Sequence, residues 1–176
     1  VKQVDLLTSC SPDLRDRICA LGVKREYSHV IPYAADPVMV AAKPDVAKGT
    51  EVRERFFPQG KGFMIFALGR LVYKKGYEFL IRALPAVLLE RPDTKLVIAG
   101  EGDLESELKN IVAELGLSHA VHFVGRLLRD AIPAYMNACD TFVMPSIRDS
   151  AGNIDGLPNV ILEAMAAAKP VVATNV

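Results

Sequence analysis

The chain has 176 residues, enough for one α/β domain with a full hydrophobic core. Lysine and arginine together number 21, as do aspartate and glutamate, so no overall charge favours nucleic acid or an anionic membrane. No apolar run reaches the roughly 18 residues of a membrane span, and no basic-then-apolar leader precedes the first elements. The three cysteines lack both zinc spacing and an even disulfide set, which favours a reducing cytosolic compartment, and the three histidines lack metal-ligand spacing. Any anion site must therefore be local, and no metal site is predicted.

The first 60 residues differ from the rest of the chain. Residues 4–8 and 28–31 are predicted to be short strands, and a helix is expected to begin with Ser11 as its cap and Pro12 at its first position. Residues 36–60 are rich in proline and charge and predict an irregular connector, with Phe56 and Phe57 anchoring it to the body of the protein. We therefore divide the chain into residues 1–35, the connector 36–60 and a domain at 61–176.

From residue 61 onward, short apolar runs alternate with amphipathic segments. Nearly continuous apolar runs are typical of strands buried on both faces of a parallel sheet, and five occur, at 63–68, 96–99, 121–124, 141–144 and 171–174. Helical spacing predicts helices at 76–90, 103–115 and 131–138. Pro85 should kink the first of these or cost about 3 kcal/mol. The pattern predicts a Rossmann-like, doubly wound α/β fold. Because the chain begins at Val1 and stops just after a strand-like run, we expect it to be truncated at both ends.

Ligands of such sheets bind at the carboxyl ends of the strands. Four predicted strands are followed by a short polar or glycine-containing segment: Gly69-Arg70, Gly100-Glu101-Gly102, Gly125-Arg126 and Pro145-Ser146. These segments are therefore expected to lie along one edge of the sheet.

The first of these segments carries two cations. Arg70 offers a planar fork for phosphate oxygens and Lys75 a mobile point charge, so together they can bind a diphosphate and balance its charge as it departs. Taken alone, the loop fits a solvated basic turn better than a diphosphate site, since charged strand-to-helix loops are common. Gly100 and Gly102 allow close approach of a ligand, or simply a plain turn. Arg126 and Leu127 follow Gly125, which either presents backbone groups to a nucleobase or only closes the strand.

The most informative stretch runs from Asp155 to Glu163. A Gly-Leu-Pro turn opens a short apolar helix, with Pro158 at the first helical position. The free N–H groups and the dipole of its first turn favour an anion beside Leu157, Pro158, Asn159 and Val160. Both carboxylates can accept hydrogen bonds from sugar hydroxyls. Glu163 could instead be one more solvated helix carboxylate, but its apolar neighbours favour a partner in a site.

In this order, Gly69-Arg-Leu-Val-Tyr-Lys-Lys-Gly76, Ala99-Gly-Glu-Gly-Asp103, Val121-His-Phe-Val-Gly-Arg126, Pro145-Ser146 and Asp155-x7-Glu163-Ala-Met-Ala closely resemble family 4 retaining glycosyltransferases. The resemblance extends over the whole chain and implies the carboxyl-terminal, donor-binding half of their two-domain GT-B fold. It implies transfer of a sugar from a UDP-, GDP- or ADP-sugar to a glycan or lipid-linked acceptor, with retention of configuration and without cofactor or metal. The acceptor would be bound by an amino-terminal domain that is not in this chain, so the chain alone is expected to be inactive.

By this likeness, the catalytic and binding group comprises Arg70, Lys75, Asp155 and Glu163. Arg70 and Lys75 would hold the diphosphate, Glu163 the ribose hydroxyls and Asp155 the hydroxyls of the transferred sugar, while Arg126 and Leu127 would border the base. Asp155 departs from the family's usual glutamate, and Ala34-Ala35-Asp36 stands where Gly-Val-Asp is common. Two alternatives remain, a nucleotide-sugar epimerase of the same fold and a non-catalytic nucleotide-sugar-binding module. We expect a cytoplasmic protein in polysaccharide biosynthesis, with peripheral attachment to the inner face of the membrane left open.

Overall fold

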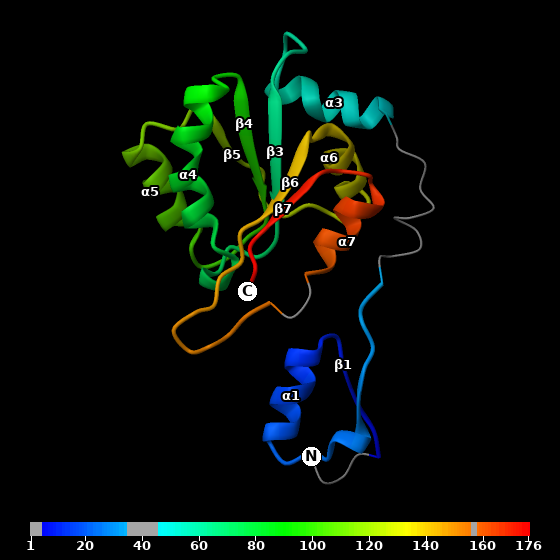
Figure 1. Ribbon diagram of the computed structural model, residues 1–176. Helices are drawn as coiled ribbons and strands as arrows, with labels where there is room; N and C mark the ends of the chain where they lie inside the picture. Colours follow the sequence, from blue (N-terminus) through cyan, green and yellow to red (C-terminus); the bar gives the residue numbers. More distant parts are fainter. Residues whose placement is uncertain (1–4, 35–45, 156–157) are drawn as a thin grey trace.

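A computed structural model describes residues 5–34, 46–155 and 158–176. Five parallel strands form the main sheet in the order β5-β4-β3-β6-β7 (Figure 1). Their bounds are Phe63–Leu68 for β3, Thr94–Ala99 for β4, Val121–Phe123 for β5, Thr141–Met144 for β6 and Val171–Ala173 for β7. All five predicted strands are confirmed, and their observed ends differ from the predicted ones by at most two residues.

Helices cover both faces of this sheet. The helices α4 (Tyr77–Glu90) and α5 (Glu105–Glu114) lie on one face, and α3 (Val46–Phe56), α6 (Ile132–Ala138) and α7 (Asn159–Ala166) on the other (Figure 1). Alternate side chains of β3 enter two separate cores, with Phe66 in the first and Ile65 in the second. Burial on both faces explains why β3 is apolar at every position. The predicted doubly wound sheet is therefore confirmed.

Pro85 lies inside α4 without dividing it, since the helix runs from Tyr77 to Glu90. Its ring cannot donate to the carbonyl of Ile81, but packing of Ile81 and Leu84 in the core outweighs the loss of one hydrogen bond.

The predicted irregular connector is wrong over residues 46–56, which form α3. A weak stripe of Gly49, Val52 and Phe56 turns toward α6, and Gly49 permits the close approach, because a Cβ atom there would lie 2.9 Å from Cβ of Asn137. Tertiary packing thus overrides a polar, glycine-containing sequence. Phe57 is buried and Phe56 packs against the same core, so the predicted anchoring is confirmed. The rest of the connector before residue 46 lies outside the described residues, as do Ala35 and Asp36.

The amino-terminal residues form a small unit of their own. Strands β1 (Leu7–Ser9) and β2 (Ser28–Val30) pair in parallel, joined by α1 (Pro12–Ala20) and the turn η1 (Arg25–Tyr27). As predicted, Ser11 caps α1: its Oγ accepts a hydrogen bond from the backbone N–H of Leu14 at 3.3 Å. No helix within the described ranges is long and apolar enough to cross a membrane.

Candidate functional site

The strand order changes direction between β3 and β6. From β3 the chain winds to β4 and β5 on one side, and then crosses back to β6 and β7 on the other. The loops that follow β3 and β6 therefore lead to opposite faces of the sheet, and the carboxyl edge between them is where ligands of such sheets bind. The 3-10 turn η2 (Tyr73–Lys75) belongs to the first loop, and Ser146 and Asp155 belong to the second.

A cluster of charged side chains joins these two loops. Asp155 Oδ2 lies 2.8 Å from Lys75 Nζ and accepts a hydrogen bond from Ser146 Oγ at 2.8 Å. Asp155 Oδ1 lies 3.3 Å from Lys74 Nζ. The side chains of Asp155 and Lys75 are only 10% and 13% exposed, so their ion pair is shielded from water far more than a surface pair. Lys75 and Asp155 are thus brought together as predicted for one site.

The environment of Asp155 keeps it ionised. Burial acts to raise its pKa, but the hydrogen bonds and charges of Lys75, Ser146 and Lys74 outweigh burial, and the pKa lies below its ordinary value. Asp155 therefore carries a negative charge at neutral pH and can accept hydrogen bonds.

Backbone contacts hold the same two loops together. Gly76 has φ +67°, and a Cβ atom there would lie 1.9 Å from the carbonyl oxygen of Pro145. The N–H of Ile147 donates to the carbonyl of Lys74 at 2.8 Å. Only glycine fits at residue 76, and its presence fixes η2 against the loop that carries Asp155.

Gly100 and Gly102 serve close contacts within the protein. A Cβ atom at Gly100 would lie 1.9 Å from the carbonyl oxygen of Gly69, and one at Gly102 would lie 2.4 Å from that of Leu71. Leu71 also donates its N–H to the carbonyl of Glu101 at 2.9 Å. The two glycines let the loops after β3 and β4 pack backbone to backbone, which positions the start of the Arg70–Lys75 segment.

Tyr77 lies beneath this edge. Its hydroxyl is buried with no hydrogen-bond partner among the described residues, 2.9 Å from the point where a Cβ atom of Gly69 would be. Burial and the charge of Asp155 raise its pKa, so Tyr77 stays a neutral phenol. Gly69 is therefore needed to leave room for Tyr77.

Arg70, Arg126 and Leu127 lie along the same edge. Arg70 and Arg126 are exposed, and within the described parts of the chain neither side chain forms an ion pair or hydrogen bond. Leu127 is half-buried and packs against the core on the α6 side of the sheet. The two guanidinium groups are thus available to an anion.

The second predicted carboxylate lies on α7. Glu163 Oε2 is buried without a hydrogen-bond partner among the described residues. Burial raises the pKa of Glu163 above its ordinary value, and the charge of Arg129 opposes this only in part. An ionisable group in this state is short of a polar partner, which a ligand hydroxyl would supply.

The start of α7 differs by one residue from the prediction. Pro158 is the N-cap, with φ −67° and ψ 112°, and Asn159 is the first helical residue. The free N–H groups predicted for anion binding therefore begin at Asn159 and Val160. Leu157 lies outside the described residues.

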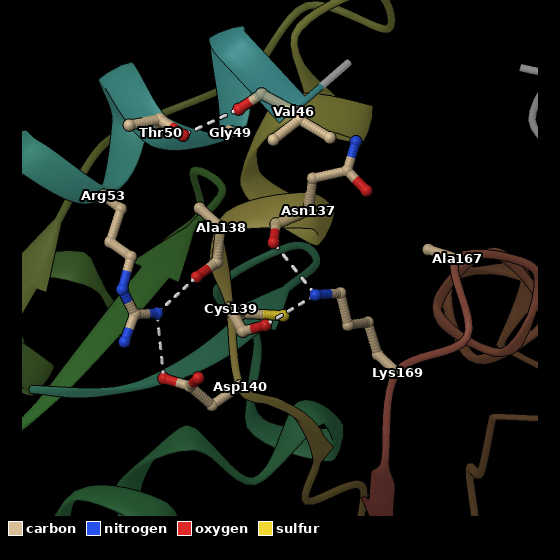
Figure 2. Close-up of a pocket in the computed structure, with 10 residues that line it drawn as sticks. All are labelled: Val46, Gly49, Thr50, Arg53, Asn137, Ala138, Cys139, Asp140, Ala167 and Lys169. Carbon is tan, nitrogen blue, oxygen red and sulfur yellow. Dashed lines mark hydrogen bonds and ion pairs between the residues drawn. The ribbon is translucent and has the colours of Figure 1, made fainter. Parts of the chain in front are cut away.

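A cavity of about 360 Å³ lies at the opposite, amino-terminal edge of the sheet, between α3, the end of α6 and the segment before β7 (Figure 2). Its two cations bind the last carbonyls of α6. Lys169 Nζ donates to the carbonyls of Asn137 and Cys139, both at 2.9 Å, and Arg53 donates to Ala138 at 2.8 Å (Figure 2). Cations at a helix carboxyl terminus stabilise it, so these contacts are structural.

Sequence reasoning missed two partners of Asp155. The sequence places Ser146 at the end of a strand but does not indicate that it lies beside Asp155, and Lys74 is not among the predicted site residues. The adjacent lysines at residues 74 and 75 were the one available signal, because a tight turn can direct both side chains to one acceptor.

Comparison with known proteins identifies the class of protein to which this chain belongs. Residues 49–176 match the family described as Glycosyl transferases group 1. The match covers most of the chain, and the chain belongs to this family.

Individual relatives agree with this class. An uncharacterized glycosyltransferase of Methanocaldococcus jannaschii is 43% identical over 113 residues, which are 64% of this chain and 27% of that protein. A GDP-mannose-dependent alpha-(1-6)-phosphatidylinositol monomannoside mannosyltransferase of Mycolicibacterium smegmatis is 35% identical over 171 residues, 96% of this chain and 44% of that protein.

Among solved structures, Anabaena HepE in complex with UDP and glucose superimposes with a TM-score of 0.81 at 26% identity, covering 97% of this chain and 44% of that one. The fold is that of the carboxyl-terminal half of a GT-B glycosyltransferase. The chain spans less than half the length of each of these three proteins.

Proposed function

We propose that this chain is the donor-binding half of a retaining, family 4 glycosyltransferase, which transfers a sugar from a nucleoside diphosphate sugar to an acceptor. The observation that carries this function is the cluster at the switch in strand order, where Lys75 and Asp155 meet at 2.8 Å from two different loops. A cation and a carboxylate side by side suit a ligand that carries both phosphate and sugar hydroxyls.

The four residues predicted as catalytic each have a role in the proposed mechanism. Arg70 and Lys75 bind the diphosphate, and Glu163 accepts from the ribose hydroxyls, which gives its buried Oε2 a partner. Asp155 accepts from hydroxyls of the transferred sugar. Its low pKa keeps it ionised for this purpose.

The chemical step exchanges one bond at the anomeric carbon for another. The bond to the diphosphate oxygen breaks while the acceptor oxygen bonds on the same face, and the acceptor proton passes to the departing diphosphate. Arg70 and Lys75 balance the charge that develops on the diphosphate, so we assign no metal or cofactor to the step. We assign no residue of this chain to binding the acceptor.

The donors and acceptors of the relatives support a proposal for the substrates of this protein. One is named as GDP-mannose-dependent and acts on a phosphatidylinositol mannoside, and HepE was crystallised with UDP-glucose. We therefore infer a UDP- or GDP-sugar donor ahead of an ADP-sugar, and a glycan or lipid-linked acceptor met on the cytoplasmic side of a membrane.

Calorimetric titration of the chain with UDP, GDP and ADP tests this function. We expect one nucleotide to bind in preference to the others. Arg70→Ala should weaken its affinity by about 1.5–3 kcal/mol, the value of a charge-assisted hydrogen bond, and Glu163→Ala should weaken it as well. Arg82→Ala removes an exposed arginine of α4 that pairs with Glu78 and serves as the matched control. Equal affinity in the Arg70 variant and the parent chain would contradict the diphosphate role.

A further inference from the structure

Lys74 has a place in the cluster that neither its sequence motif nor the family match assigns. We infer that Lys74 is a positioning residue, which holds the Asp155 carboxylate in the orientation that receives the transferred sugar. This role rests on the proposed function. It concerns the part of the site that binds the sugar of the donor and not the part that binds the nucleoside diphosphate.

The two carboxylate oxygens of Asp155 have different partners. Oδ2 is engaged twice, by Lys75 and Ser146 at 2.8 Å each, whereas the contact to Oδ1 within the described residues is Lys74 Nζ at 3.3 Å. Partners on one oxygen alone leave the carboxylate plane free to turn about the Cβ–Cγ bond. A cation on the second oxygen fixes that plane, and with it the direction of the remaining lone pairs.

The backbone of Lys74 is held against the start of the loop that carries Asp155. Its carbonyl accepts the N–H of Ile147 at 2.8 Å, and Gly76, which follows η2, is in close contact with Pro145. The Lys74 side chain is only 27% exposed, compared with 75% for the Lys24 side chain in a surface pair. Less side-chain freedom is lost in forming this pair than in forming an ordinary surface ion pair.

Two lysines on one carboxylate allow a division of roles. Lys75 is the closer of the two and is the cation that the proposed mechanism directs to the diphosphate. When a diphosphate takes hydrogen-bond donors from Lys75, Asp155 loses part of its charge compensation. Lys74 then keeps the carboxylate ionised and in place, since it lies on the opposite oxygen. Within the described residues, the charged groups that face Asp155 are these two lysines, with the hydroxyls of Ser146 and Tyr77 beside them.

The test compares a nucleotide with its sugar conjugate, UDP with UDP-glucose and GDP with GDP-mannose, by titration of the whole chain. We expect Lys74→Met to weaken binding of the nucleotide sugar about fivefold, the effect of losing one partly exposed ion pair, and to leave the sugar-free nucleotide within twofold. Lys74→Arg should restore most of the loss. Lys61→Met, which removes an exposed lysine before β3, controls for the change in net charge.

A second measurement does not depend on a ligand. NMR titration of the Asp155 carboxyl carbon should show a higher pKa in Lys74→Met than in the parent chain, because one neighbouring cation is gone. Equal weakening of nucleotide and nucleotide sugar would place Lys74 on the diphosphate and overturn the inference, as would an unchanged Asp155 pKa. If the parent chain binds none of the four compounds while the pKa rises as expected, the proposed function is wrong and the orienting contact stands.

Discussion

The two carboxylates predicted for one site have opposite electrostatic surroundings. Asp155 is held ionised by Lys75, Ser146 and Lys74, which more than offset its burial, whereas burial dominates at Glu163. Interactions with neighbouring charges make Asp155 a contributor to stability at neutral pH, and it loses that contribution as pH falls through its lowered folded pKa. Glu163 acts in the other direction. A carboxylate can therefore either stabilise or destabilise the ligand-free site, depending on its surroundings.

Glu163→Gln should stabilise the ligand-free chain at neutral pH. The pKa of Glu163 is raised in the folded state. The folded state therefore binds more protons than the unfolded state at pH values above the ordinary glutamate pKa of about 4.3. The stability of the parent chain falls as pH rises through this range. We expect the variant to raise the free energy of unfolding at pH 7 by about 1 kcal/mol after allowance for partial exposure, and to have little effect near pH 4. Urea unfolding at both pH values measures this difference. A loss of stability at pH 7 would show that the ionised carboxylate has a partner in the empty site.

At the scale of elements, the strands of the main sheet could be predicted because their signal is local. Because β3 is buried on both faces, it is apolar at every position, and this run of apolar residues can be recognised in the sequence itself. The helix α3 could not be predicted in the same way, since Gly49 and Val52 become a buried face only when α6 lies against them. The contact of Lys74 with Asp155 is hidden for the same reason, because 81 residues separate the two in sequence.

The contact between η2 and the loop after β6 depends on one glycine. Gly76 and Gly116 both have φ +67°, but a Cβ atom at Gly116 would meet nothing within 4 Å, whereas one at Gly76 would lie 1.9 Å from the Pro145 carbonyl oxygen. Gly116→Ala should therefore lower the free energy of unfolding by only about 1 kcal/mol, the cost of the left-handed conformation for a residue with a Cβ atom. Gly76→Ala should cost about 3 kcal/mol, because the loop must also move. Denaturant unfolding of the two variants gives the comparison, and equal losses would mean that η2 and the loop are not held by this contact.

For the whole molecule, the two edges of the sheet differ in how far their polar groups are paired within the protein. Within the described residues, the carboxyl edge carries a Glu163 oxygen and a Tyr77 hydroxyl that are buried without hydrogen-bond partners, and two exposed arginines that are available to a ligand. At the amino edge, the two cations that line the cavity, Arg53 and Lys169, both have acceptors within the protein. Arg53 donates hydrogen bonds to three residues, Ala138, Asp140 and Gly62. Its guanidinium lies 5.2 Å from the centre of the Phe57 ring. We therefore expect ligand binding and stability to depend on opposite edges of the sheet.

Arg53→Met tests this separation. The variant keeps an apolar stem against Phe57 but leaves the half-buried Asp140 carboxylate without its cation and the Ala138 carbonyl without its donor, so we expect a loss of about 2 kcal/mol in the free energy of unfolding. Because the substitution lies at the edge opposite Lys75 and Asp155, the affinity for the preferred nucleoside diphosphate should stay within twofold at a temperature where the variant is folded. Arg70→Ala should show the reverse, weaker nucleotide binding at unchanged stability, since its exposed side chain forms no ion pair or hydrogen bond within the described residues. Loss of both properties in either variant would mean that the two edges are coupled through the strands that connect them.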